Sequence, residues 1–144
     1  MEKRIIALVE ARYPHLLAIP GCGPLAAAKI AGETANATRF RSEACFAMNA
    51  GVAPLPVWSG NTRGRVRMSR TGNRQLNAAL HRIAVTQIRL DGIGQVYYRK
   101  RIDHGDSAVE ALRCLKRRLA RTVFNSLITD QQRREIPPNL PLAA

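Results

Sequence analysis

The stretch "SAVEALRCLKRRLARTVFNSL", Ser107 to Leu127, decides the expected fold. Apolar residues recur in it at every third or fourth position, which places them on one face of an α-helix. They are Leu112, Leu115, Leu119, Val123 and Leu127. Ser107 and Glu110 form a capping box, because each side chain satisfies a backbone N–H that the first helical turn leaves unpaired. The stretch therefore predicts a long helix with one buried face.

The composition of the 144-residue chain favours helices packed on helices. Hydrophobic residues make up 46% and aromatic residues only 5%, so the core must consist mostly of Leu, Ile, Val and Ala. We expect a mainly α fold over residues 1–130, a compact helical domain with a helix-hairpin-helix motif and a long basic loop or short hairpin. The proline-rich segment 131–144 is expected to be a disordered tail.

Local start and stop signals predict where the other helices lie. Residues 2–12 form a short helix, and Pro24 opens the next one, since proline suits the first helical position. Ser42 caps a further helix, for which Gly51 is the stop. Helical spacing of apolar residues returns from Asn73.

The charge of the chain points to a polyanionic partner. Lys and Arg number 23 against 10 Asp and Glu, a formal net charge of +13. Nucleic acid is the favoured partner, and an anionic membrane is second because the arginines are spread over several segments. The sequence has no signal peptide and no apolar stretch of bilayer length. We expect a cytoplasmic, nucleoid-associated protein without a membrane partner.

The three cysteines do not indicate a metal site. Cys22, Cys45 and Cys114 are far apart, odd in number and lack zinc-ligand spacing. They indicate buried or free thiols in a reducing compartment.

The stretch "IPGCGPLAAAKI", Ile19 to Ile30, has the pattern of a helix-hairpin-helix, which we expect over about residues 16–32. Gly21 and Gly23 allow a tight turn, and the N-terminus of the following helix can hold a DNA phosphate. Lys29 adds a positive charge on the same helix. The alternative is a sharp corner between two helices that binds nothing.

A second basic segment, residues 52–74, includes "VWSGNTRGRVRMSRTGNR" from Val57 to Arg74. Arginine binds phosphate through a planar fork of donors, and the arginines here are Arg63, Arg65, Arg67, Arg70 and Arg74. The segment is expected to bind a phosphate backbone; the alternative is a solvated loop. Trp58 stacks on a base or anchors the loop on the core.

Several residues in or after this segment could take part in chemistry or in nucleic-acid binding. By its residue context alone, Ser59 is a turn residue, because Ser-Gly is common in turns. A nucleophilic serine needs a base, and no clear base for it is found in the chain. His81 is the histidine best placed to meet the segment, and its alternative is a partly buried polar residue. The stretch Tyr97–Arg101 pairs aromatic rings with cations, so it either lines nucleic acid or covers the helix surface.

Five motifs in order resemble the C-terminal transposase domain of the DEDD transposases of insertion-sequence family one-hundred-ten. They are "IPGCGPLAAAKIAGE", "RFRSEACFAMNAGVAP", "SG" with "SRTGNRQLNAAL", "YYRKRIDHG" and "AVEALRCLKRRLARTVFNSL". The resemblance runs from about Leu16 to Leu127. It implies a recombinase whose serine attacks a DNA phosphate and forms a phosphoserine link, and Ser59 is the matching position. By the same resemblance, four residues shape or contact the site: Arg70, Gly72, Asn73 and Arg74.

The resemblance also sets expectations about cofactors and partners. In that family four metal-binding acids lie in an N-terminal RuvC-like domain, which has no counterpart in this sequence. We therefore expect no metal site in this chain, and Mg²⁺ only together with such a domain. DNA, a guide RNA and a second copy of the chain are the implied partners.

The interpretation is a DNA-binding and strand-exchange domain of an insertion-sequence transposase, from a truncated gene product or an excised fragment, that does not catalyse alone. One alternative is a non-catalytic helix-hairpin-helix module that binds DNA or RNA. Another is a basic, RNA-associated structural protein of the ribosomal kind.

Overall fold

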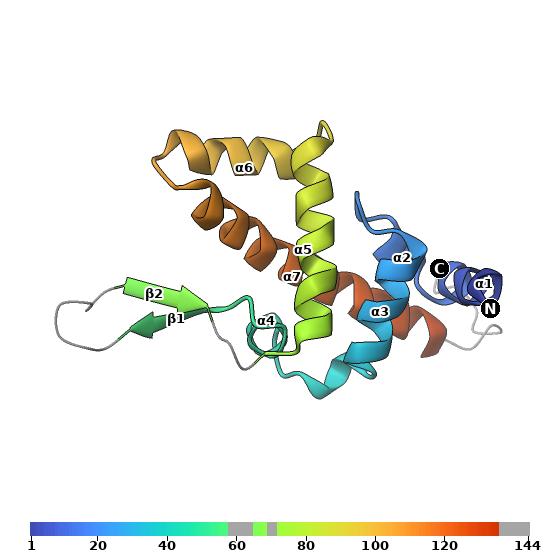
Figure 1. Ribbon diagram of the computed structural model, residues 1–144. Coiled ribbons are helices and arrows are strands. Elements are labelled where there is room, and N and C mark those ends of the chain that lie inside the picture. The colour runs from blue at the N-terminus through green and yellow to red at the C-terminus, as the bar shows by residue number, and fades with distance from the viewer. Residues whose placement is uncertain (58–64, 69–71, 136–144) are drawn as a thin grey trace, which may run out of the picture.

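The computed structural model describes residues 1–57, 65–68 and 72–135, and most of them are helical (Figure 1). The elements in chain order are α1 (Glu2–Arg12), α2 (Pro14–Leu17), α3 (Pro24–Thr34), the 3-10 helix η1 (Ala37–Arg39), α4 (Glu43–Asn49), β1 (Pro54–Val57), β2 (Arg65–Met68), α5 (Arg74–Arg89), α6 (Ile93–Asp103) and α7 (Ala108–Glu135). The expected mainly α fold is confirmed.

Helix α7 is the central element of the fold. It packs against α2, α4, α5 and α6, and it crosses behind α5 in Figure 1. Its buried face includes Leu115, Leu119, Val123 and Leu127, as the sequence spacing predicted. The capping box is also present, because the Ser107 N–H donates to the Glu110 carboxylate at 2.9 Å and the Glu110 N–H donates to the Ser107 hydroxyl at 3.2 Å.

A second group of helices completes the core. Helix α3 lies on α5 and on α1. Ala27 and Ile30 of α3 and Leu80 and Ile83 of α5 are fully buried. Small residues on α3 let the two helices approach closely, since alanine adds little bulk beyond the backbone. The aliphatic core expected from the composition is therefore present.

The predicted helix boundaries at Pro24, Ser42, Gly51 and Asn73 are confirmed. Pro24 is the first residue of α3, and the Ser42 hydroxyl accepts a hydrogen bond from the backbone N–H of Cys45 at 3.3 Å. Gly51 follows α4 with a φ of +71°, a left-handed conformation that favours glycine. The Asn73 side chain accepts from the backbone N–H of Leu76 and so caps α5.

The C-terminal end of α7 corrects the predicted boundary of the tail. The helix continues to Glu135, so residues 131–135 are helical. Gln131 accepts a hydrogen bond from the backbone N–H of Ala37, while Arg133 and Arg134 donate to backbone carbonyls of the first helix at 2.9 and 2.7 Å. These contacts with distant segments hold the last turns of α7. Residues 136–144 lie outside the described residues.

One buried carboxylate joins the two ends of the chain. Asp130 of α7 is fully buried and accepts backbone N–H bonds from His15 and Leu16, both at 3.1 Å. Its carboxylate also lies 2.7 Å from Nδ1 of His15. Asp130 therefore satisfies amides at the start of α2, which have no partner within that helix.

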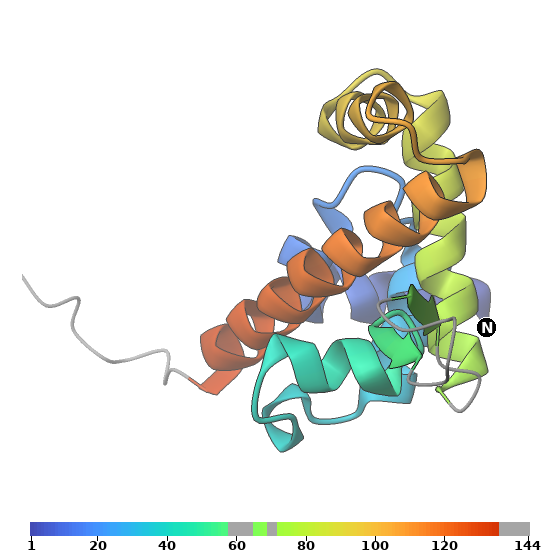
Figure 2. The same cartoon turned by 90° about the vertical axis from the view of Figure 1, so that its left-hand side faces the viewer.

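The basic segment forms a hairpin rather than a long loop. Strands β1 and β2 pair antiparallel, with Val57 opposite Arg65 and Leu55 opposite Arg67. The strands project from the helical body beside α4 and the beginning of α5, on the left of Figure 1 and toward the viewer in Figure 2. The short-hairpin alternative is therefore the observed one.

Candidate nucleic-acid interface

The base of the β1–β2 hairpin is held by backbone and side-chain hydrogen bonds. The backbone N–H of Asn73 donates to the carbonyl of Asn49 at 2.6 Å. The side-chain amide of Asn77 donates to the carbonyls of Ala50 and Gly51 at 3.0 and 3.3 Å. Lys116 of α7 donates in turn to the Asn77 carboxamide oxygen at 2.8 Å. The start of the hairpin is thus fixed to both α5 and α7.

Several predicted site residues belong to this segment. Ser59, Arg63 and Arg70 lie outside the described residues. Arg65 and Arg67 occupy β2, where their register is known. The hypothesis that these five residues contact nucleic acid stays a prediction. Trp58 also lies outside the described residues.

Asn73 and Arg74 stand at the point where the segment enters α5. The Asn73 side chain is half-buried, and its Nδ2 donates to Glu33 of α3 at 2.9 Å while its oxygen caps α5. Arg74 is exposed beside it. Asn73 is therefore engaged inside the protein, while Arg74 is accessible to solvent.

The corner between α2 and α3 carries the other predicted phosphate contacts. Gly21 has a φ of +85° and lies against Thr86 of α5. Gly23 is exposed at the start of α3, and Lys29 is exposed further along that helix. Gln87 donates to the carbonyl of Pro20 at 2.7 Å and ties the corner to α5. The corner has helices on both sides, of which α2 is only four residues long, and its phosphate binding stays a prediction.

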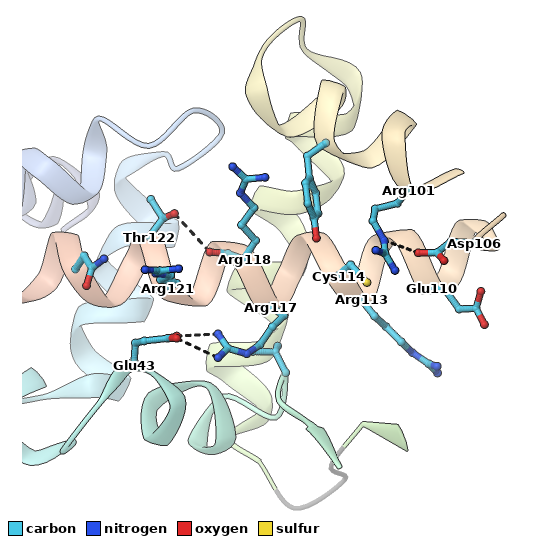
Figure 3. A pocket seen from close by; sticks show the side chains of 13 residues that line it. Glu43, Arg101, Asp106, Glu110, Arg113, Cys114, Arg117, Arg118, Arg121 and Thr122 are labelled. Carbon is cyan, nitrogen blue, oxygen red and sulfur yellow. Dashed lines mark hydrogen bonds and ion pairs between the residues drawn. The ribbon is translucent and has the colours of Figure 1, made fainter. Parts of the chain in front are cut away.

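The structure adds a basic surface that was not among the predicted sites. We call it the arginine hollow, a depression of about 940 Å³ with α7 as its floor, between α6 and α4 (Figure 3). It is lined by Glu43, Val52, Tyr97, Arg101, Asp106, Glu110, Arg113, Cys114, Arg117, Arg118, Arg121, Thr122 and Asn125. Five arginines thus face three carboxylates.

Two ion pairs cross the arginine hollow. The Glu43 carboxylate accepts hydrogen bonds from both terminal nitrogens of Arg117, at 2.7 and 3.1 Å. Arg101 of α6 donates from Nε to Asp106 at 2.6 Å. Figure 3 shows both pairs as dashed lines. The guanidinium of Arg118 lies 4.6 Å from the centre of a tyrosine ring on α6, a cation–π distance.

The pKa values of two groups in and beside the hollow are shifted. The hydrogen bond from Arg117 lowers the pKa of Glu43, and the nearby charges of Arg117 and Arg121 lower it further against the opposing effect of burial. Burial lowers the pKa of Lys116, as does the neighbouring charge of Arg113. Glu43 therefore stays ionised and available to its partner at neutral pH.

The arginines of α7 have a sequence signal that the site prediction did not use. Arg113, Arg117 and Arg121 are spaced four residues apart, which brings them to one side of a helix. The spacing could have indicated a basic stripe. It could not have indicated the opposing walls, because α4 and α6 meet α7 only in the folded chain.

A smaller depression of about 520 Å³ lies beside the hairpin base, on α5. Arg74, His81 and Arg82 line it together with Gly51 and Gly72. His81 is exposed, so the alternative of a partly buried histidine is wrong. His81 is exposed because it lies on a face of α5 that points away from the core. It lines the same depression as Gly51 and Gly72, next to the base of the basic segment.

Neither a metal cluster nor a membrane helix is found in the described part of the chain. Within residues 1–57, 65–68 and 72–135, no three His, Cys, Asp or Glu side chains are grouped so that they could hold a metal ion. The same ranges contain no helix that is both long and apolar enough to cross a bilayer.

The sequence of the chain matches a known protein family. A family model described as "Transposase IS116/IS110/IS902 family" matches residues 13–99. The chain belongs to this family. Membership agrees with the resemblance carried by the ordered motifs, since the matched range includes the α2–α3 corner and the hairpin.

Curated relatives of the family are similar over most of the chain. The "Insertion element IS110 uncharacterized 43.6 kDa protein" of Streptomyces coelicolor is 32% identical over 129 residues, which cover 88% of this chain and 32% of the relative. The "Insertion element IS900 uncharacterized 42 kDa protein" of Mycobacterium paratuberculosis is 29% identical over 119 residues, 78% of this chain and 30% of the relative. The chain spans less than a third of the length of either relative.

Proposed function

We propose that this chain is the nucleic-acid-binding and strand-exchange domain of an insertion-sequence transposase. Membership of the IS116/IS110/IS902 family is the observation that carries the proposal. The net charge of +13 supports it, because so large an excess of cations favours association with a polyanion. The hairpin with its arginines and the α2–α3 corner are the proposed contacts to DNA phosphates.

Ser59 is the proposed nucleophile. Its Oγ would attack the phosphorus of a DNA phosphodiester, forming an Oγ–P bond while the bond from phosphorus to one deoxyribose oxygen breaks. The serine proton passes to a base or to solvent, and the departing strand leaves with a free hydroxyl. A hydroxyl of another strand can then attack the phosphoserine and reverse these changes. The link conserves the energy of the phosphodiester, so exchange needs no external energy source.

The arginines of the hairpin segment are proposed to stabilise this step. Attack on a phosphodiester concentrates negative charge on the phosphate oxygens, and positioned guanidinium groups lower the cost of that charge. Arg63, Arg65 and Arg67 are the proposed donors. From the family resemblance, we propose that any Mg²⁺ is bound by a separate RuvC-like domain.

The test is a covalent-adduct assay. The full chain is mixed with a RuvC-like domain from the same family, Mg²⁺ and labelled DNA, and adducts are separated on a denaturing gel. An adduct that disappears in Ser59→Ala and persists in Ser69→Ala is expected. An adduct that survives Ser59→Ala, or no adduct with any chain, overturns the role of Ser59. Salt-sensitive binding without an adduct would favour the non-catalytic binding module.

Two further partners are proposed from the family resemblance alone. A guide RNA would select the DNA, and a second copy of the chain would bring two DNA strands together. Binding of a candidate RNA and the mass of the chain by light scattering test these proposals separately.

A further inference from the structure

We propose that the arginine hollow is a second nucleic-acid-binding site, which grips the phosphate backbone of one strand at a position separate from the hairpin. The inference rests on the proposed function, because it assumes a nucleic-acid partner. It adds a place on the surface that neither the motifs nor the family match assigned. Among the described residues, Val52 at the base of the hairpin is the one member of the basic segment that lines the hollow.

The charges inside the hollow are unevenly paired. Each of its three carboxylates already has a partner: Glu43 binds Arg117, Asp106 binds Arg101, and Glu110 belongs to the capping box of α7. Among the described residues, no hydrogen bond or ion pair engages the guanidinium of Arg113 or Arg121. With five arginines against three carboxylates among its described lining residues, the hollow has a net positive charge on a concave surface, which concentrates the electrostatic potential.

Three of the arginines in the hollow are evenly spaced along α7. Arg113, Arg117 and Arg121 recur every four residues, a rise of about 6 Å per step at about 1.5 Å per residue. A nucleic-acid strand carries one charge about every 3.4 Å along a duplex axis. The spacing of the row is therefore of the same order as the spacing of charges on a nucleic-acid strand, so several of its arginines can contact one strand.

The ion pair of Glu43 and Arg117 lies within reach of a ligand in the hollow. Both side chains are partly open to solvent, each with 30% of its surface exposed. The pair is bidentate, and a guanidinium binds phosphate with the same two-pronged geometry that it uses for carboxylate. A phosphate can therefore replace the Glu43 carboxylate as the bidentate partner of Arg117.

The first experiment compares salt dependence between two double variants of equal charge. Arg113→Gln/Arg121→Gln removes two exposed cations of the hollow. Arg4→Gln/Arg12→Gln removes two exposed cations of α1, at the opposite end of the molecule (Figure 1). Circular dichroism and thermal melting establish that both variants are folded. Affinities for duplex DNA and for an RNA hairpin are measured between about 50 and about 200 mM salt.

The hollow variant should lose about 1.8 from the slope of log K against log salt on duplex DNA, since each phosphate contact contributes about 0.9. The α1 variant should keep the wild-type slope, because charges beyond a Debye length of about 10 Å are screened. If the hollow variant loses slope on only one of the two probes, that probe identifies whether the hollow binds DNA or RNA. Equal slopes for the two variants on both probes overturn the inference.

A second readout uses a cysteine inside the hollow. Cys114 lines the hollow and is partly exposed, whereas Cys45 is exposed on α4 outside it. Bound nucleic acid should slow alkylation of Cys114 several-fold and leave Cys45 unchanged. Equal rates at Cys114 with and without a saturating probe contradict the inference.

The failures of the two proposals are distinguishable. A wild-type chain without salt-dependent binding to either probe overturns nucleic-acid binding as a whole, and the hollow with it. Wild-type binding that is indifferent to Arg113→Gln/Arg121→Gln overturns the second site alone. The adduct assay on Ser59 does not depend on either result.

Discussion

Gly72 lies directly against Gly51, so that a Cβ at Gly72 would meet the backbone N and Cα of Gly51. This contact brings together the two ends of the segment that contains the hairpin and Ser59. The adjacent hydrogen bond from Asn73 to Asn49 closes the same gap. The position of the segment on the helical body therefore depends on a backbone approach that only glycine allows.

Gly72→Ala should destabilise the protein. The added methyl group overlaps backbone atoms, which cannot rotate away as a side chain can, so we expect a loss of about 1–3 kcal/mol in the free energy of unfolding. Urea unfolding monitored by circular dichroism measures it. Gly32→Ala is the control, because Gly32 lies within helix α3 and no atom lies within 4 Å of a Cβ at that position. Alanine is favoured over glycine inside a helix, so this variant should be about 0.5–1 kcal/mol more stable than wild type. Equal stability of the two variants would contradict the close approach.

Asp130→Asn should destabilise the junction between α7 and α2. The carboxylate accepts two backbone N–H bonds in a fully buried position, and an amide offers one oxygen where two are needed. We expect a loss of about 3 kcal/mol, the cost of breaking a buried charged contact. Urea unfolding measures it. Asp103→Asn removes the same charge from an exposed position of α6 and should change stability by less than about 0.5 kcal/mol.

Glu43→Gln should tighten binding of nucleic acid. The substitution removes a negative charge from the arginine hollow and leaves Arg117 without its ionic partner. We expect affinity to rise about fivefold at low salt, which corresponds to about 1 kcal/mol. Fluorescence anisotropy with a labelled duplex measures it. Glu10→Gln removes an equal charge from an exposed position on α1 and should leave affinity unchanged; the same gain in both variants would count against a local effect.

The Glu43–Arg117 pair should stabilise the fold at neutral pH and lose its contribution in acid. The hydrogen bond from Arg117 lowers the pKa of Glu43 in the folded protein. The unfolded chain therefore takes up the proton first, near the ordinary glutamate pKa of about 4.3. Stability from this source is complete above that value and falls as the pH drops through the folded pKa.

Urea unfolding of wild type and Glu43→Gln across the acid range tests this pH dependence. The difference in unfolding free energy between the two proteins should shrink as the pH falls below about 4.3. A difference that stays constant down to strongly acidic pH would show that Glu43 acts without its charge.

Local signals in the sequence were enough to predict where several of the helices begin. Ser107 and Glu110 cap α7, Ser42 caps α4 and Asn73 caps α5, as expected. Each cap joins atoms within three residues of one another, so the free energy that favours it is present in the short segment itself. The ordered motifs likewise indicated the family, to which the chain belongs. The role of Ser59 stays a prediction.

The sequence by itself thus determined where several helices start, which faces are apolar and which segments are basic. Only the tertiary structure decided that Asp130 binds backbone N–H groups at His15, or that Arg117 meets Glu43 and completes the arginine hollow. These partners are more than 70 positions apart in the chain. Their contacts exist because helices pack side by side through their buried faces, and local helix signals do not encode which faces meet. The same packing carries α7 beyond the boundary expected at residue 130.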